Sequence, residues 1–244
     1  MRVYSNIHEA YVGTLSDVLH NYDYVTSPRG MLIREKVDYA FKVVKPTAEP
    51  VITKDAARNI IIEEYTRKEV ALYDSCSNKV EDFAKASKFW EKIANADGTI
   101  NSAYGHLIWA KKSHGNPAFS DKMVTPWTWA LNSLVEDKDT RQAILRFSLP
   151  EHAYPGVQDF TCTMNGNFLI RDNRLHFTIS MRSNDLVKGL AYDMSWFVSL
   201  MDRMLIDLRG KYPYLTKGNY THFANSSHIY MKDEEMVKKM IGEQ

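Results

Sequence analysis

Apolar residues recur at the spacing of amphipathic helices along much of the chain. In the longest such stretch, Thr53 can cap the first turn and Asp55 suits the turn itself. Glu69 lies within the apolar stripe that follows, which consists of Ile61, Ile62, Tyr65, Val70, Leu72 and Tyr73. A second, strongly apolar stretch ends at Gly210 and predicts a central buried helix. The predicted helices cover residues 7–19, 53–74, 80–94, 127–135, 192–208 and 233–240, with Pro126 near the first turn of the fourth.

Strands are predicted where apolar residues alternate with polar ones or form short continuous runs. Residues 160–181 read as two strands joined by a turn at Asp172-Asn173, and Leu175, Phe177, Ile179 and Met181 share one face of the second strand. The predicted strands lie within residues 31–44, 143–147, 160–181 and 221–230. Because strands and helices mix without strict alternation, the pattern predicts an α+β fold.

Breaks in the pattern mark turns and not domain boundaries. A turn is predicted at Ser27-Pro28-Arg29-Gly30, the third helix should end before Asp97-Gly98, and a surface loop is expected around His114-Gly115. No Pro/Gly/Ser-rich linker divides the chain, so we interpret residues 1–244 as one domain.

Composition limits the partners and the compartment. Hydrophobic residues make up 44% of the 244, enough for a sizeable core. Lys+Arg is 31 and Asp+Glu 30, so no bulk attraction to nucleic acid or anionic lipid is indicated, and an anion should be held by a local site. No apolar stretch approaches the roughly 20 residues that span a bilayer. The two cysteines, Cys76 and Cys162, and the lack of a signal-peptide pattern favour a reducing cytoplasm.

Cys162 and the polar cluster that follows it are the first candidates for chemistry. A lone cysteine on a strand is commonly a small buried hydrophobe, and that alternative stands for Cys162 taken by itself. Twenty residues later, Arg182 and Ser183 follow an apolar strand and could bind a phosphate through a charged fork and a hydroxyl. The alternative for these two residues is a solvated strand end.

Seven motifs in order along the chain carry a resemblance to a known family. They are Ser27-Pro28-Arg29-Gly30 with Arg34-Glu35; Tyr65 through Tyr73; Phe89-Trp90 with Asn101-Ser102-Ala103-Tyr104-Gly105; Asp137-Lys138-Asp139-Thr140-Arg141-Gln142; Cys162; Arg182-Ser183-Asn184-Asp185 with Gly189 and Asp193; and His228-Ile229-Tyr230. In order and spacing they resemble the thymidylate synthase superfamily. The resemblance implies a mixed sheet packed with helices, one face of which forms a homodimer.

The resemblance also implies a mechanism and assigns its parts. Cys162 would add as a thiolate to carbon 6 of a pyrimidine, which activates carbon 5 to attack the methylene of the co-substrate 5,10-methylenetetrahydrofolate. Tyr104 and a water network would remove the proton at carbon 5, with Glu69 relaying protons. Trp90 and Asp185 match residues that bind the folate, and Asp185 also matches a nucleotide-binding position.

Phosphate binding carries over to a set of arginines and a serine from two subunits. Arg29, Arg182 and Ser183 would act in one subunit and Arg141 in its partner, whereas Gln142 stands where the family has a second arginine from the partner subunit. His228 and Tyr230 match the pair that binds the sugar hydroxyl. A zinc site at His222 and His228 lacks clustered ligands, so no metal is expected. The resemblance requires no membrane or nucleic acid.

Asp193 bears on the choice of base, because thymidylate synthases have asparagine at the matching position. A carboxyl group can accept from the amino group of cytosine and share a proton with ring nitrogen 3. An aspartate stands there in the family's deoxycytidylate hydroxymethylases, which this sequence resembles most. The alternative is that Asp193 merely starts or caps the helix that follows.

Several departures favour water over hydride as the nucleophile that adds to the exocyclic methylene. Few residues follow Tyr230, Ile93 replaces a second tryptophan, and Thr163 replaces a histidine. The sequence therefore predicts hydroxymethylation of a cytidine monophosphate, with dCMP favoured. A dCMP methylase, a dUMP-specific enzyme and an inactive nucleotide- or RNA-binding relative remain as alternatives.

Overall fold

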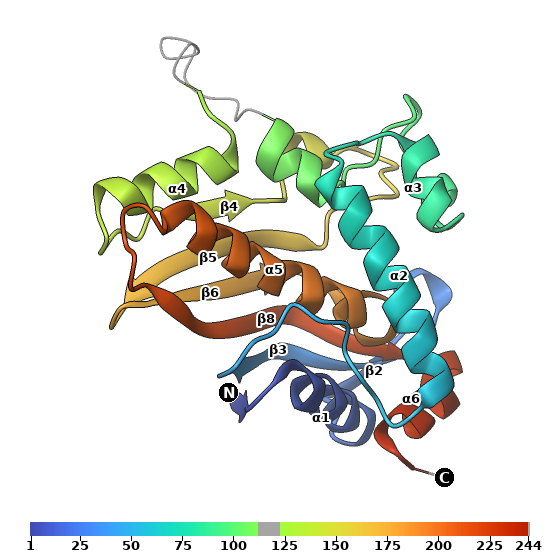
Figure 1. Cartoon of the computed structure of the whole chain (residues 1–244). Helices are drawn as coiled ribbons and strands as arrows, with labels where there is room; N and C mark the ends of the chain where they lie inside the picture. The colour runs from blue at the N-terminus through green and yellow to red at the C-terminus, as the bar shows by residue number, and fades with distance from the viewer. Residues whose placement is uncertain (112–122, 244) are drawn as a thin grey trace.

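The computed structural model describes residues 1–111 and 123–243, so the loop predicted around His114-Gly115 lies outside the described residues. One mixed sheet runs through this part of the chain in the order β1-β3-β8-β6-β5-β4, with β2 added to β3 and β7 to β8 (Figure 1). The strands are β1 (Arg2–Tyr4), β2 (Tyr24–Thr26), β3 (Ile33–Val43), β4 (Ile144–Arg146), β5 (Thr163–Arg171), β6 (Arg174–Met181), β7 (Asn184–Asp185) and β8 (Thr216–Tyr230). The α+β prediction is confirmed, although the short strands β1, β2 and β7 were not predicted.

Helices cover one face of this sheet. They are α1 (Ile7–His20), α2 (Ala56–Asp74), α3 (Val80–Ala86), α4 (Pro126–Glu136), α5 (Ala191–Leu208) and α6 (Glu234–Ile241). The apolar helix α5 lies over β6 and β8 and packs against α2, while α1 packs against β3 (Figure 1). Two single π-helical turns adjoin these helices: His106–Ala110 packs against α4, and Leu186–Leu190 directly precedes α5. None of the described helices is both long and apolar enough to span a bilayer.

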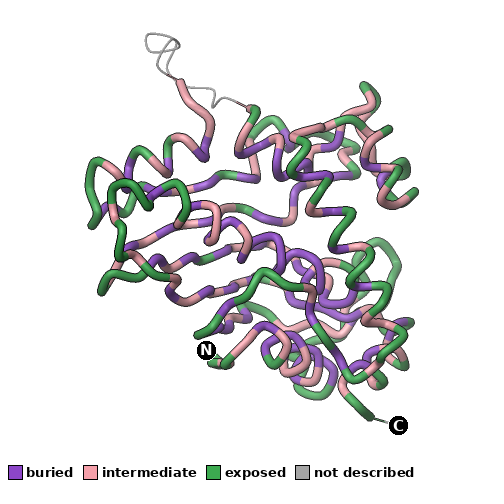
Figure 2. Tube along the Cα trace, viewed as in Figure 1, coloured by how far each residue is buried: buried purple, intermediate pink, exposed green. Residues whose placement is uncertain are grey.

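The sheet is apolar on the helix side and mixed on the other. Along β6, Leu175, Phe177 and Ile179 are fully buried, as their period-two spacing predicted. Figure 2 shows the same alternation of buried and less buried residues along the neighbouring strands. The turn between β5 and β6 places Asp172 and Asn173 at φ 49° and 55°, the left-handed pair that a two-residue hairpin needs.

Four predictions about helix ends and faces were wrong. Asp55, not Thr53, caps α2, because its carboxylate accepts from the backbone N–H groups of residues 57 and 58 at 3.0 and 3.1 Å. On that helix Ile61 is 51% exposed and lies outside the buried stripe. The helix predicted over 80–94 ends at Ala86, and residues 90–92 form a separate 3-10 turn. The last residues of α5 are followed by Arg209 in a right-handed conformation, so Gly210 supplies no left-handed cap.

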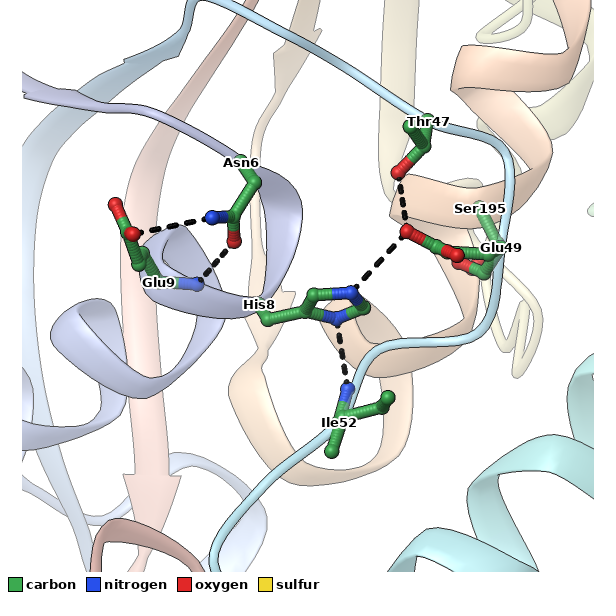
Figure 3. A network of polar contacts seen from close by, with 7 residues as sticks. All are labelled: Asn6, His8, Glu9, Thr47, Glu49, Ile52 and Ser195. Atoms are coloured by element: carbon green, nitrogen blue, oxygen red, sulfur yellow. Dashed lines mark hydrogen bonds and ion pairs between the residues drawn. The ribbon is translucent and has the colours of Figure 1, made fainter.

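A polar network fixes the segment between β3 and α2 against α1 and α5 (Figure 3). The amide of Ile52 donates to Nδ1 of His8 at 3.0 Å, so Nε2 carries the ring proton toward Glu49, 3.2 Å away. Ser195 of α5 donates to the carbonyl of Glu49 at 2.8 Å. The side chain of Asn6 caps α1 at the same place. These contacts hold the start of α5, which carries Asp193, in a fixed position.

Candidate active site

Cys162 lies directly before β5, at a point where the chain is held by an arginine from the end of β6. The backbone N–H of Arg182 donates to the carbonyl of Cys162 at 2.9 Å, and its guanidinium Nε donates to the carbonyl of Thr161 at 3.1 Å. Nη2 of the same group donates to the carbonyl of Phe160 and lies 3.6 Å from the Cys162 Sγ. Burial raises the pKa of the Cys162 thiol, and the Arg182 guanidinium opposes that rise. The arrangement therefore places a cation where a thiolate would form.

The pairing of β7 and β3 with β8 gathers further predicted residues at the same end of the sheet. Asp185 pairs with His228 in the parallel β7–β8 ladder, and the rings of His228 and Tyr230 lie 5.4 Å apart at 88°. Ile33 pairs with Tyr230, which brings the turn containing Arg29 near the phenol. Burial raises the pKa of Tyr230 and the charge of Asp185 adds to the rise, while the charge of Arg29 partly opposes it. Burial lowers the pKa of His228, so its imidazole is neutral near pH 7.

Two carboxyl groups, those of Asp185 and Asp193, lie near the Cys162 thiol, and their charges act on it. Asp185 directly precedes a π-helical turn, and the helix α5 follows that turn. One oxygen of Asp185 accepts from the N–H groups of residues 187 and 188 at 2.9 and 3.0 Å and so starts the π-helical turn. Asp193 lies in the first turn of α5, where Leu190 holds the cap position, so Asp193 does not cap the helix, although an acid in the first turn favours its start. Burial raises the pKa of Asp193 to about 7, and the negative charge of Asp185 adds to the rise.

Glu69 is 6% exposed on the inner face of α2. Burial raises its pKa to about 8, and the charge of Asp193 contributes, while the hydroxyls of Tyr65 and Tyr73 act in the opposite direction by hydrogen bonding. These tyrosines precede and follow Glu69 by one helical turn, so all three side chains share a face. Sequence analysis missed the tyrosines as partners of Glu69, although their i−4 and i+4 spacing was a usable signal.

Tyr104 lies in a layer of aromatic side chains, near the charge of Asp193. Its ring stacks on that of Tyr73 at 5.2 Å, and its hydroxyl accepts a hydrogen bond of 2.9 Å from Thr163. Burial raises the pKa of Tyr104 well above its usual value, and the nearby charge of Asp193 raises it further. The phenol is therefore neutral at physiological pH, which rules out a resting phenolate as the base.

Trp90 connects to the same cluster through its indole. Nε1 of Trp90 donates to the hydroxyl of Tyr65 at 3.3 Å, which links it to Glu69. The exposed ring of Phe89 lies 5.8 Å from that of Trp90 in an edge-on arrangement. The rings of Phe89 and Trp90 therefore adjoin Glu69 and Tyr65 on the α2 side of the site.

Arg141 lies apart from the cluster within its own chain. Ile144 pairs with Asn167 in the β4–β5 ladder, so the exposed Arg141 lies near the end of β5 opposite to Cys162. A hydrogen bond of 3.2 Å from Arg171 to the carbonyl of Asp139 holds this loop at the far end. Ser183 is half-buried in the turn between β6 and β7, beside Arg182.

Arg34 and Glu35 of the first motif make structural contacts, and Glu35 also adjoins the cluster because it pairs with His228 in the β3–β8 ladder. Arg34 forms an ion pair of 3.0 Å with Glu234 and donates to the carbonyl of Leu19 at 2.7 Å. The carboxylate of Glu35 accepts from Ser226. These contacts fasten β3 to α1, α6 and β8.

His222 is a buried structural residue. Asn184 donates to its Nε2 at 3.3 Å, so Nδ1 carries the proton and donates to the Tyr220 hydroxyl at 2.8 Å. Burial lowers the pKa of His222 to about 3. In the described part of the chain, no three His, Cys, Asp or Glu side chains are grouped as metal ligands would be.

Comparison with known proteins adds relatives of two kinds. The family model described as thymidylate synthase matches residues 9–244. The deoxycytidylate 5-hydroxymethyltransferase of Enterobacteria phage T6 is 29% identical over 182 residues, which are 72% of this chain and 70% of that protein. The enzyme of the same name from Enterobacteria phage T4 is 30% identical over 151 residues, 60% of this chain and 57% of that protein. The match to the T4 protein therefore spans less than two thirds of its length.

A solved structure confirms the fold. Thermostable thymidylate synthase A from Bacillus subtilis superimposes with a TM-score of 0.71 over 97% of this chain and 84% of that one, at 18% identity. At this identity the likeness establishes the architecture alone.

Proposed function

This chain belongs to the thymidylate synthase family of one-carbon transferases acting on pyrimidine nucleotides, and we propose that its own substrate is dCMP, which it converts to 5-hydroxymethyl-dCMP. The one-carbon unit comes from 5,10-methylenetetrahydrofolate, the family's co-substrate, and the hydroxyl oxygen from water. The names of the phage relatives support the product, and the phage origin supports a cytoplasmic setting in a bacterium or an infected host cell. We propose that residues 1–244 act as one catalytic domain.

The observation that carries the choice of base is the buried carboxyl group of Asp193. Its pKa of about 7 means that it can hold a proton or share one near neutral pH. Cytosine with a proton shared at ring nitrogen 3 offers two donors to the two oxygens of a carboxylate, which gives a charge-assisted pair. Uracil offers one donor and one acceptor, so an ionised carboxylate faces the lone pairs of oxygen 4. An Asp193 carboxyl group that is ionised, or that shares its proton with ring nitrogen 3, therefore favours cytosine.

Cys162 is the proposed nucleophile. The Arg182 guanidinium, 3.6 Å from Sγ, stabilises the thiolate that adds to carbon 6 of the base. As that bond forms, the electrons of the carbon 5–carbon 6 double bond move to carbon 5 and into the ring. A proton supplied by Asp193 to ring nitrogen 3 neutralises the charge that builds up there. Carbon 5 can then bond to the methylene carbon of the folate as the bond from that carbon to N10 breaks and N10 takes up the electron pair and a proton.

Glu69 and Tyr104 have the proposed task of moving the carbon 5 proton. The pair of electrons from the broken C–H bond expels tetrahydrofolate and leaves an exocyclic methylene. Water adds to the methylene carbon as the Cys162 thiolate leaves carbon 6, which restores the aromatic ring. Because the Tyr104 phenol is neutral, it orders the water that accepts the proton, and Glu69, with a pKa of about 8, can take up and return protons.

The phosphate and sugar sites follow from the residues at the end of the sheet. We assign the phosphate to Arg29, Arg182 and Ser183, and the sugar hydroxyl to the neutral imidazole of His228 and the phenol of Tyr230.

We propose that the enzyme is a homodimer whose subunits pack through the sheet. The sheet face opposite α5 carries half-buried apolar side chains, among them Leu169 and Phe223. Arg141, at the far end of β5 from its own Cys162, would complete the phosphate site of the partner subunit. Trp90 and the free oxygen of Asp185 are the proposed folate contacts, since the exposed Phe89 ring extends an aromatic surface for a pterin or aminobenzoyl group.

Release of tritium from carbon 5 of labelled dCMP tests this function. Release should require methylenetetrahydrofolate and should be lost in the Cys162→Ser variant, while the Cys76→Ser variant serves as the matched control and keeps it. Mass spectrometry of the product should show a gain of CH₂O. A gain of CH₂ with formation of dihydrofolate would indicate a methylase, faster release from dUMP would indicate the other base, and no release would indicate a binding protein.

A further inference from the structure

Thr163 carries a buried hydroxyl that contacts the Tyr104 phenol, next in sequence to the proposed nucleophile. It follows Cys162 directly, begins β5 and is fully buried. The β5–β6 register shifts between Thr163 and Asn165, which marks a bulge at this point. Bulges beside active sites turn side chains away from the regular alternation of a strand. The Thr163 Oγ1 donates to the hydroxyl oxygen of Tyr104 at 2.9 Å, across 59 positions of sequence.

The Tyr104 ring has little freedom to respond to its surroundings. Tyr73 stacks on it at 5.2 Å, Phe147 meets it edge-on at 5.2 Å, and its residue is 5% exposed. The remaining freedom is the direction of the phenol proton, which lies near the ring plane and can point to either side of the C–O bond. A donor on one side occupies the lone pair there, so the proton points to the other side.

We propose that Thr163 is a positioning residue that holds Tyr104 as a hydrogen-bond donor toward the base of the bound nucleotide. The proposal rests on the proposed function, in which the phenol orders the water that accepts the carbon 5 proton. A phenol proton aimed at that water fixes its position and leaves a water lone pair free to take the proton. Without the Thr163 hydroxyl, the phenol proton can rotate toward β5, and the water loses its fixed partner.

The experiment measures single-turnover tritium release from labelled dCMP in Thr163→Val, Thr163→Ser and Tyr104→Phe variants, together with the double variant Thr163→Val/Tyr104→Phe. Valine matches threonine in shape and lacks the hydroxyl, so release should slow by roughly tenfold to hundredfold with dCMP affinity unchanged within about twofold. Serine keeps the donor and should restore release to within about threefold of the native rate. In the Tyr104→Phe background, the valine substitution should slow release by less than about twofold, because the two groups act as a unit.

A control separates positioning from general loss of stability. Thr14 on α1 is also fully buried, and Thr14→Val should leave tritium release unchanged whatever it does to Tm. A Thr163→Val enzyme that loses thermal stability but releases tritium at the native rate would overturn the proposal, as would equal effects of valine in the presence and absence of the Tyr104 hydroxyl. A native enzyme that releases no tritium would instead remove the proposed function itself.

Discussion

Replacing Asp193 by asparagine should move the enzyme's preference from cytosine toward uracil. Asparagine has the same shape, but its amide cannot give a proton to ring nitrogen 3 as negative charge builds up during thiolate addition. It can donate to oxygen 4 of uracil and accept from the N–H at position 3. The substitution thus removes a charge-assisted pair with one base and creates a matched pair with the other.

The size of the change follows from the burial of the site. Asp193 is 9% exposed, so a mismatched polar edge there cannot be satisfied by bulk water. Such an edge costs about 1–3 kcal/mol, which corresponds to roughly 5- to 150-fold in kcat/KM for each base. Because loss on dCMP and gain on dUMP act together, the ratio of the two kcat/KM values should fall by at least roughly tenfold.

A competition assay with equal dCMP and dUMP measures that ratio directly by product mass. The ratio does not depend on the fraction of folded enzyme, so loss of stability does not disguise the result. Asp17→Asn is the matched control, since Asp17 is a buried carboxylate on α1 paired with Arg2 at 2.5 Å and distant from the base. An unchanged ratio in Asp193→Asn would refute the assignment of base recognition to this carboxyl group.

Further predictions concern pH, subunits and the thiol. The pKa values of Glu69 and Asp193 are raised to about 8 and about 7 in the folded state. Their contribution to stability is therefore complete below about pH 4, where the unfolded groups titrate, and declines until it is lost at about pH 8. The Tm of the protein should fall between about pH 4 and about pH 8, and less steeply in Glu69→Gln. Inactive Arg141→Ala and Cys162→Ser chains, mixed and allowed to exchange subunits, should recover about a quarter of native activity if Arg141 acts across a two-fold dimer, and none if it does not. In Arg182→Lys, alkylation of Cys162 should shift to higher pH, since lysine cannot hold two carbonyls and the thiol together; an unshifted alkylation profile would contradict the role given to that guanidinium.

The sequence predicted the long elements because each carries its own period. The α5 and β6 patterns repeat over many residues, so their burial is readable without tertiary information. Local patterns failed where pairing or capping depends on distant segments. β1 has three residues and exists because it pairs with β3, some 39 positions later, and the helix over 80–94 breaks at Ser87, where the apolar spacing gives no signal.

The site shows the same division. Cys162, Arg182 and His228 lie at or near the ends of strands that the pattern located, and strand pairing then brings them close to Asp185 on the unpredicted β7. The partners that tune these residues could not be located this way. Thr163 was visible in the sequence only as a departure from the family, because its partner Tyr104 lies on another element.

The two raised pKa values bear on why the acids are there at all. Burial and the charges of other acids raise both pKa values, and in the described part of the chain no lysine or arginine lowers the pKa of Glu69 or Asp193. A buried carboxyl group without a cation destabilises the folded state at neutral pH relative to an uncharged residue of the same shape. A structural role would be better filled by glutamine or asparagine. Two such acids, one of them near the Cys162 thiol and the neutral Tyr104 phenol, are therefore most simply explained by a reaction that needs protons held and released near pH 7.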